Sequence, residues 1–210
     1  MPYYPIFLDI SGLPCLVVGG GETARQKTDP LLECGGQVTL VSPTLIPPLR
    51  RYADDGRIGW QERGYRSGDT DGFRLVICAT DDTAVNRQVF EEAEGHGIPV
   101  NVVDVPSQCR FITPSVLRRG ALCIAVSTGG KSPAMAKKIR RQLETQFGPE
   151  YAALLELLGD ARARMKERFA DDAQERLKRY EKLTDSDLLD LIRANKMDEA
   201  RNRVEACLSR

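Results

Sequence analysis

The chain has 210 residues, 41% of them hydrophobic and 29% charged, enough to bury a core of ordinary size. Its 30 basic and 30 acidic residues cancel, which excludes a global field that would attract nucleic acid or a membrane surface. No apolar run approaches the roughly 20 residues that span a bilayer. The N-terminus lacks the basic and long apolar regions of an export signal, so we expect a cytoplasmic protein.

The cysteines and the single histidine argue against a permanent metal site. The six cysteines are irregularly spaced, and none forms a Cys-x-x-Cys pair. Cys15, Cys78 and Cys123 lie in apolar, strand-like runs, where a thiol behaves as a small hydrophobe. This favours reduced, structural cysteines. His96 is flanked by glycines and is expected in a turn, so a histidine-based zinc site is nearly excluded.

The most informative stretch runs from Cys15 to Lys27. Four apolar residues predict a short buried strand, three glycines follow, and helix formers continue from Glu22. The spacing Gly19-x-Gly21-x-x-Ala24 is the dinucleotide fingerprint in its G-x-G-x-x-A form. Gly19 permits the tight turn, Gly21 lets a diphosphate approach the backbone, and the open N–H groups of the helix start bind it. A plain turn is the alternative.

Strands and helices alternate up to residue 104. Residues 4–10 fit an edge strand or an arm. Pro30 is expected to kink or interrupt the fingerprint helix, and Gly35-Gly36 to end it. Further strands are predicted at 37–41, 59–62, 75–79 and 99–103, with helices at 22–34 and 84–95. This alternation predicts a Rossmann-like, doubly wound parallel sheet.

Polar residues at the carboxyl ends of these strands are candidate cofactor contacts, because open α/β sheets bind their ligands there. Thr80 and Asp81 follow one strand, although Asp81 or Asp82 also fits as the cap of the next helix. Ser42 stands where NAD-selective sites usually carry an acid. Arg50 and Arg51 are close enough in sequence to meet a 2′-phosphate, or they form a solvated helix face. Spacing therefore leaves NAD against NADP open.

The segment after Asp104 is basic, because no acid follows until Glu144. A single-signed patch would concentrate anionic ligands, whereas a solvated helix face explains its last four cations equally well. The basic residues are Arg110, Arg118, Arg119, Lys131, Lys137, Lys138, Arg140 and Arg141.

A second strand–loop–helix unit lies inside this segment, at Leu122–Pro133. Ser132 is placed as the N-cap and Pro133 as the first helical residue. The hydroxyls of Ser127, Thr128 and Ser132, together with Lys131, could bind carboxylate or phosphate. From Tyr151 the pattern is helical, with short helices expected at 185–193 and 197–208, forming a module that supports a dimer or covers the active site.

These motifs together resemble the siroheme synthase family, that is, precorrin-2 dehydrogenases and their bifunctional relatives that also act as sirohydrochlorin ferrochelatases. The resemblance covers roughly residues 3–141 and rests on Pro5-Ile-Phe, Val17-Val-Gly-Gly-Gly21, Ala79-Thr-Asp-Asp82, Asn101-Val-Val-Asp104, Phe111-Ile-Thr-Pro-Ser115 and Ala125-Val-Ser-Thr-Gly-Gly-Lys-Ser-Pro133. It implies NAD-dependent oxidation of precorrin-2, and a homodimer in which the middle segment and tail intertwine.

The resemblance also implies residue roles. Asp104 takes the place of the family's catalytic aspartate, and it is also the carboxylate that its strand-end position favours as general base. Glu22-Thr23 and Pro43-Thr44 lie along the NAD. Thr128 falls in the tetrapyrrole region, at a position that is commonly serine in relatives. Arg118 belongs to the basic segment that suits a polycarboxylate macrocycle.

The expected organisation is a NAD-binding domain at 1–113, a small α+β dimerisation and tetrapyrrole-binding segment at 114–148, and a helical module at 149–210. The resemblance also implies ferrochelatase activity, which some relatives lack, with Asp104 as a transient Fe²⁺ contact because a hard carboxylate suits that ion. The alternatives are a dehydrogenase without chelatase activity and a non-catalytic NAD(H)-sensing module.

Overall fold

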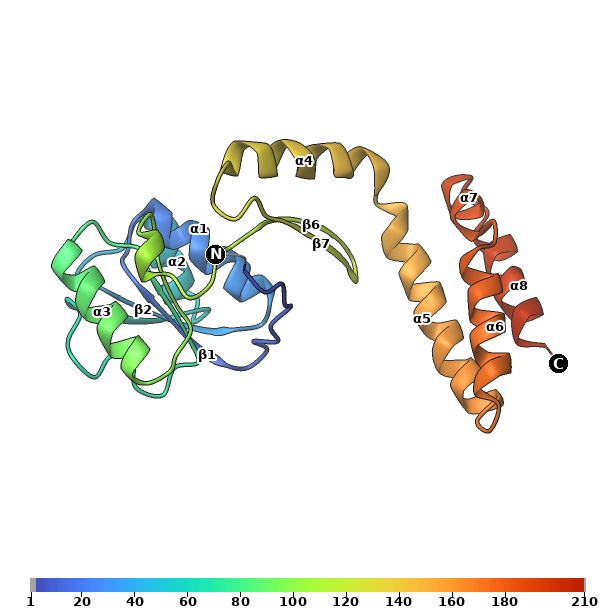
Figure 1. Ribbon diagram of the computed structural model, residues 1–210, viewed down its shortest axis with the longest axis horizontal. Coiled ribbons are helices and arrows are strands. Elements are labelled where there is room, and N and C mark those ends of the chain that lie inside the picture. Colours follow the sequence, from blue (N-terminus) through green and yellow to red (C-terminus); the bar gives the residue numbers. More distant parts are fainter. Residues whose placement is uncertain (1–2, 210) are drawn as a thin grey trace. The chain divides into compact units, whose positions relative to one another are not determined.

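The computed structural model describes residues 3–209 and contains two compact units, the first ending at Thr113 and the second beginning at Pro114. The first unit is built on a parallel sheet in the order β3-β2-β1-β4-β5. Its strands are β1 (Pro14–Val18), β2 (Gln37–Ser42), β3 (Gly59–Glu62), β4 (Leu75–Cys78) and β5 (Val100–Val102). The predicted parallel α/β sheet is confirmed (Figure 1).

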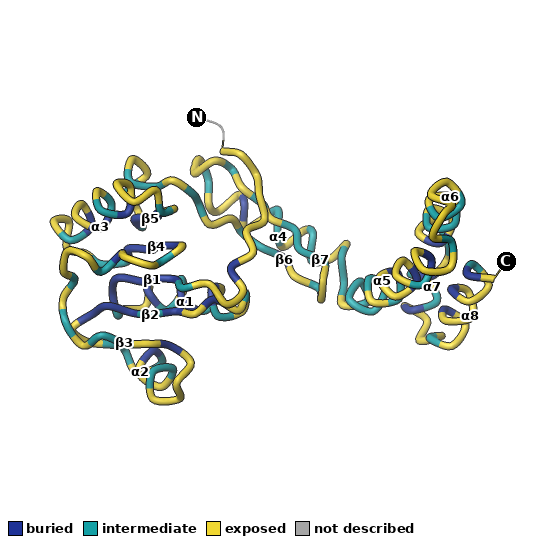
Figure 2. Tube along the Cα trace, turned by 90° about the horizontal axis from the view of Figure 1, so that it is seen from below, coloured by how far each residue is buried: buried dark blue, intermediate teal, exposed yellow. Residues whose placement is uncertain are grey.

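Helices cover both faces of this sheet, as β1 illustrates. Cys15 and Val17 belong to one core cluster with Ala24 of α1, whereas Leu16 and Val18 belong to a second cluster that involves α3. Side chains alternate between the faces of a strand, so an uninterrupted apolar run serves two cores. The helices are α1 (Glu22–Glu33), α2 (Pro47–Asp54) and α3 (Thr83–Gly95), with a 3₁₀ turn, η1, at Pro106–Gln108. Figure 2 shows the strands side by side in the order β5, β4, β1, β2 and β3, with β1, β2 and β4 mostly buried.

Local signals fix the ends of α1 and α3. Helix α1 continues through Pro30 to Glu33, so the proline does not interrupt it. Gly35 has a φ of +75° and donates to the Leu32 carbonyl, while the Gly36 N–H bonds to Leu31 O. This is the glycine-dependent helix stop expected from the sequence. Asp82 caps α3 by accepting from Ala84 N at 2.9 Å and Val85 N at 3.2 Å.

The N-terminal segment forms no strand over residues 3–10, so the edge-strand alternative is wrong and the segment is an arm. Ile10 is buried in the core, but the large apolar side chains before it face solvent within the described part of the chain. Tyr4 is 87% exposed and Phe7 is 74% exposed.

The second unit begins with an antiparallel hairpin of β6 (Ser115–Arg119) and β7 (Leu122–Val126). Gly120, with a φ of +56°, turns the chain between them. Five helices follow: α4 (Pro133–Gln146), α5 (Glu150–Arg168), α6 (Ala173–Thr184), α7 (Leu188–Arg193) and α8 (Met197–Leu208). Helix α6 was not foreseen as a separate element. Between residues 3 and 209, no helix is long and apolar enough to cross a membrane.

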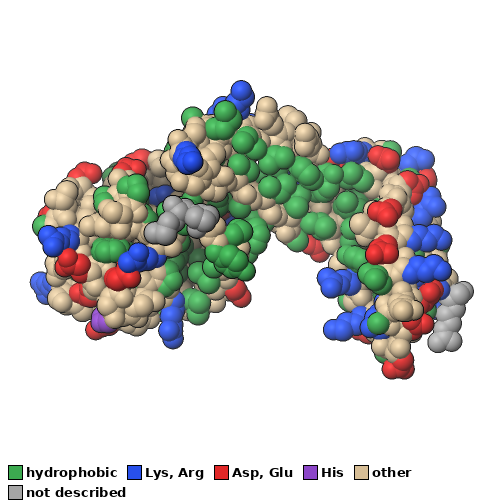
Figure 3. All heavy atoms as spheres, in the orientation of Figure 1, with side chains coloured by type: hydrophobic (Ala, Val, Ile, Leu, Met, Phe, Trp, Pro, Cys, Tyr) green, Lys and Arg blue, Asp and Glu red, His purple; other side chains and the backbone are tan. Residues whose placement is uncertain are grey.

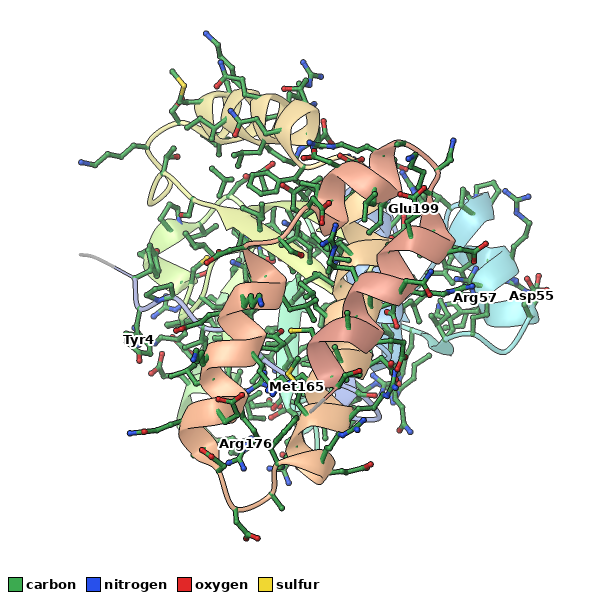
Figure 4. All side chains as sticks on the ribbon, turned by 90° about the vertical axis from the view of Figure 1, so that its right-hand side faces the viewer. Tyr4, Asp55, Arg57, Met165, Arg176 and Glu199 are labelled. Carbon is green, nitrogen blue, oxygen red and sulfur yellow. The ribbon has the colours of Figure 1, made fainter. Side chains whose placement is uncertain are left out.

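The buried core of the second unit lies among its C-terminal helices. Met165 is 2% exposed and Leu183 is 1% exposed, and Figure 4 shows Met165 among the helices. The hairpin contributes little to this core, since Leu117 is its one fully buried residue among those described. Figure 3 shows apolar side chains gathered over α4, the hairpin and the start of α5.

Candidate cofactor and catalytic site

Strand register brings four loops to one edge of the sheet. Val18 pairs with Val41 on one side and Cys78 on the other, and Cys78 pairs with Val102. The loops that follow β1, β2, β4 and β5 therefore start at the same level. Chain order reverses between β1 and β4, and ligands of open α/β sheets bind at such a switch point.

The three glycines of the turn after β1 have different functions. Gly19 has a φ of +127°, and a Cβ there would lie 2.3 Å from the Ala79 carbonyl oxygen. Gly20 packs still more closely, since a Cβ would lie 1.9 Å from the Thr44 carbonyl oxygen. Ile46 N also donates to Gly20 O at 2.9 Å, which ties the turn to the loop after β2. The fingerprint spacing leaves Gly20 unassigned, and only the unbroken glycine run hints at it.

Gly21 has a different surrounding, because a Cβ there would meet nothing within 4 Å. It is the N-cap residue of α1, and no side chain caps this helix start. The N–H groups of the first turn are thus available, and the positive end of the helix dipole faces the same space. An open backbone with uncapped donors fits a diphosphate.

The side chains predicted along the cofactor are placed as follows. Ser42 donates its hydroxyl to Thr44 O at 2.8 Å, which shapes the loop after β2 and leaves Pro43 and Thr44 exposed. The Thr80 hydroxyl accepts from Asp82 N at 3.2 Å, and Asp81 is exposed beside it.

Glu22 and Thr23 follow Gly21 in the first turn of α1, and both are exposed. Arg25 donates to both Glu22 carboxylate oxygens, with Nε 3.0 Å from Oε2. Hydrogen bonds from Arg25 and Gln26 lower the pKa of Glu22. Glu22 is therefore an anion paired along the helix.

The Arg50 side chain makes two contacts with other residues of the first unit. Its guanidinium lies 4.5 Å from the centre of the Trp60 ring, and its Nε lies 3.3 Å from an Asp54 oxygen. Of the two roles considered for Arg50, the structure favours the helix-surface residue over a 2′-phosphate ligand.

Asp104 lies two residues beyond the end of β5, on the edge shared with the glycine turn. It is exposed and has a φ of +63°, a conformation in which Asp and Asn are enriched among non-glycine residues. Val103 N donates to Cys78 O at 2.9 Å, so the backbone beside Asp104 is anchored to β4.

The segment after Asp104 returns along β5 and is held there by several contacts. Asn101 Nδ2 donates to Phe111 O at 2.8 Å, and Arg110 N donates to Val100 O at 2.8 Å. The Cys109 thiol donates to Val102 O at 3.1 Å. Burial raises the pKa of this thiol, consistent with a structural cysteine.

Lys27 of α1 reaches the far end of the same segment, a role that no sequence signal indicated. Its Nζ donates to Thr113 Oγ1 at 2.9 Å, across 86 positions of sequence. Partial burial lowers the pKa of Lys27, while the charges of Asp104 and Cys109 raise it. The cofactor helix and the segment that carries Asp104 are thus connected.

In the second unit, the loop between β7 and α4 is ordered by its own hydroxyls. Ser127 Oγ accepts from Gly129 N at 3.0 Å, and Thr128 Oγ1 accepts from Ser132 N at 3.0 Å. Ser132 caps α4 by accepting from Met135 N at 3.2 Å. Each hydroxyl accepts in these bonds, so its own proton remains to be donated to a ligand oxygen. Lys131 is exposed in the same loop.

The basic residues that follow Asp104 in sequence belong to different units, and several of them are already paired. Arg110 lies in the first unit, pairs with Glu94 and stacks over Phe90, and Arg140 pairs with Glu144. Arg119 Nε donates to Phe147 O at 3.1 Å, and Arg118 is exposed on β6. A shallow pocket of about 480 Å³ lies along α4, lined by Ala134, Lys137, Lys138, Arg141, Gln142 and Thr145. The cationic surface is therefore smaller than the sequence suggests.

The parallel sheet, the close-packed glycine turn and the uncapped start of α1 define a dinucleotide-binding protein. Comparison with family models agrees: the putative NAD(P)-binding family matches residues 6–115, the sirohaem biosynthesis protein central region matches 119–146, and the sirohaem synthase dimerisation region matches 150–208. The chain belongs to the siroheme synthase family.

Individual relatives support this. The siroheme synthase of Methylococcus capsulatus is 44% identical over 167 residues, which cover 80% of this chain and 35% of that protein. That of Ruthia magnifica is 38% identical over 208 residues, which cover 99% of this chain and 44% of that protein. The chain thus spans less than half the length of these curated relatives. The solved structure of SirC, a precorrin-2 dehydrogenase, matches with a TM-score of 0.77 at 25% identity, covering 97% of this chain and 100% of that one.

Proposed function

We propose that this protein oxidises precorrin-2 to sirohydrochlorin with NAD as the hydride acceptor. The observation that carries the proposal is the position of Asp104, on the sheet edge that also holds the open glycine turn. The SirC match covers nearly the whole chain and supports the same reaction.

The residues that hold the cofactor are those of the shared edge. The backbone of Gly19–Gly21 and the first turn of α1 bind the diphosphate, with Glu22 and Thr23 beside it. Ser42, Pro43 and Thr44 line one side, and Thr80 and Asp81 the other. Arg50 is held by Trp60 and Asp54, which argues against Arg50 as a 2′-phosphate ligand. Bound NAD supplies the hydride-accepting nicotinamide.

Asp104 acts as the general base. Oxidation of the macrocycle removes a hydride and a proton, and the exposed carboxylate of Asp104 accepts that proton. Hydrogen bonds to β4 and to the segment that returns along β5 hold the backbone on both sides of Asp104. The backbone that carries the carboxylate is therefore in place before the substrate binds.

The substrate is a polycarboxylate, and the second unit offers donors for it. Ser127, Thr128 and Ser132 retain hydroxyl protons, and Lys131 and Arg118 add exposed cationic side chains. We assign these residues to substrate binding.

We further propose the organisation expected from the sequence: a NAD-binding domain at 1–113, a dimerisation and substrate-binding segment at 114–148, and a helical module at 149–210. The half-buried apolar side chains of the hairpin fit an interface between two copies of this chain, since one copy leaves them incompletely covered. A dimer mass in sedimentation equilibrium tests this. A cytoplasmic location stays a prediction.

The central test is substitution of Asp104. Asp104→Ala should lower the rate of NADH formation from precorrin-2 by about 10²- to 10⁴-fold, the usual range for a general base. Its affinity for NAD should stay within a few-fold, measured by fluorescence titration. Asp104→Asn is the matched control for folding, because Asn tolerates a positive φ. An Asp104→Ala protein with ordinary turnover would refute the assignment, and tight NAD binding without turnover in the unsubstituted protein would indicate a sensor.

The siroheme synthase relatives favour a second activity, insertion of Fe²⁺ into sirohydrochlorin. Asp104 is the candidate transient contact for this substrate ion, because a carboxylate suits Fe²⁺. Siroheme should then form faster with the protein than without it, and Asp104→Ala should abolish the difference. Equal rates with and without protein would leave a dehydrogenase only.

A further inference from the structure

Lys27 occupies an unusual place for a helix-surface lysine. Ala24, Thr28 and Leu31 form the buried stripe of α1, and Lys27 lies at the border of this stripe. The residue is partly buried, and its ammonium donates to the hydroxyl of Thr113, the last residue of the first unit. A lysine at such a border ordinarily extends into water, so this placement requires an explanation.

The surroundings of Lys27 supply one. Asp104 and Cys109 are the titratable groups whose charges act on it. No ion pair within 4 Å joins Lys27 to Asp104 in the described part of the chain, so the Asp104 carboxylate stays open to a substrate. An ammonium has three donors, and Thr113 uses one of them.

We propose that Lys27 is a positioning residue for Asp104: it holds the segment 104–113 against α1 through its hydrogen bond to Thr113 and through the attraction between its charge and the charges of that segment. The proposal rests on the proposed function, in which Asp104 is the base. Helix α1 then has two roles. Its N-terminal turn binds the cofactor, and the Lys27 side chain, further along the helix, positions the segment that carries Asp104.

Three variants separate the charge of Lys27 from its hydrogen bond. Lys27→Met removes both while keeping the aliphatic stem, Lys27→Arg keeps the charge, and Thr113→Val removes the hydrogen-bond acceptor alone. Lys27→Met should lower kcat for NADH formation by about 10- to 100-fold, the size expected when a catalytic group is misplaced by about 1 Å. The KM for NAD should stay within about two-fold, because the glycine turn is untouched, and Lys27→Arg should restore most of kcat.

The expected Thr113→Val result is a smaller loss than that of Lys27→Met, because the charge remains. If Lys27→Met turns over at the normal rate, or raises the KM for NAD with kcat unchanged, the proposal is overturned. A normal circular-dichroism spectrum and melting temperature must accompany each variant, and Thr113→Val, which should still lower kcat, carries the comparison if Lys27→Met does not fold.

A measurement without turnover keeps this proposal separate from the proposed function. In protein labelled with ¹³C-lysine, NMR titration should show that Asp104→Asn lowers the pKa of Lys27 further, because the attraction of the carboxylate is lost. An unchanged Lys27 titration would overturn the link between the two residues. Absence of precorrin-2 oxidation by the unsubstituted protein would instead refute the proposed function alone.

Discussion

At the residue scale, neighbouring glycines in one turn are required for different reasons. Gly20 is needed for close packing against the Thr44 carbonyl, whereas Gly21 has open space in front of it. The requirement at Gly20 concerns the fold, whereas the one we propose at Gly21 concerns a ligand, although both residues belong to one unbroken glycine run.

Substitution should separate these two requirements. Gly20→Ala should lower the free energy of unfolding by about 1–3 kcal/mol, as overpacking usually does. Gly21→Ala should leave that free energy nearly unchanged and weaken NAD binding. Urea denaturation and NAD titration measure the two effects.

Gly95, the last residue of α3, is the matched control, because a Cβ there meets nothing within 4 Å and lies far in sequence from the turn. Gly95→Ala should alter neither stability beyond about 1 kcal/mol nor NAD affinity. Equal behaviour of the Gly20 and Gly21 variants would contradict the distinction.

At the scale of the elements, the hairpin and the C-terminal helices of the second unit differ in how they bury apolar surface. Helices α5, α6, α7 and α8 share a core that includes Leu158, Met165 and Leu183. The hairpin buries Leu117 fully and leaves its other apolar side chains half-covered. The helices are thus stabilised by their own packing, whereas the hairpin keeps apolar surface that a single copy of the chain covers only in part.

Two leucines of α6 test this packing. Leu183→Ala should cost about 2–5 kcal/mol, because Leu183 is 1% exposed within the helical core. Leu177 is 59% exposed on the same helix, so Leu177→Ala should change stability by less than about 0.5 kcal/mol. Thermal unfolding followed by circular dichroism compares them, and equal losses would show that α6 packs differently.

At the scale of the whole molecule, the two units have separate hydrophobic cores. A ligand stabilises the unit that binds it, by about 2.7 kcal/mol at a concentration 100 times its Kd. The residues proposed to bind the cofactor all belong to the first unit.

NAD should therefore raise the unfolding temperature of the first unit and leave that of the helical core unchanged, as measured by scanning calorimetry. Gly21→Asp should abolish the shift, because a carboxylate would occupy the open space in front of the glycine turn. A shift of both transitions by NAD would mean that the units unfold as one.

Much of the first unit could be predicted from the sequence, because its signals are local. The apolar run Cys15–Val18 predicts a buried strand, Gly35-Gly36 a helix stop, and Asp81 or Asp82 a helix cap, and the structure shows all three, with Asp82 as the cap. Each depends on a few adjacent residues, so spacing and residue type suffice.

Other features depended on residues that meet only in the folded chain. A glycine is needed at position 20 because the Thr44 carbonyl lies so close to it. Arg50 stacks on the Trp60 ring, and Lys27 donates a hydrogen bond to Thr113. The neutralisation of Arg110 by Glu94 is of the same kind, and it divided a basic segment that looked continuous in sequence.

The sequence by itself determined the alternation of strands and helices, the fingerprint turn and the strand-end position of Asp104. Only the tertiary structure decided which of these polar groups are already occupied by a neighbour and which remain open to a ligand. The physical reason is that hydrogen bonds, packing clashes and charge pairing act over a few ångströms in space, whatever the separation of the partners along the chain.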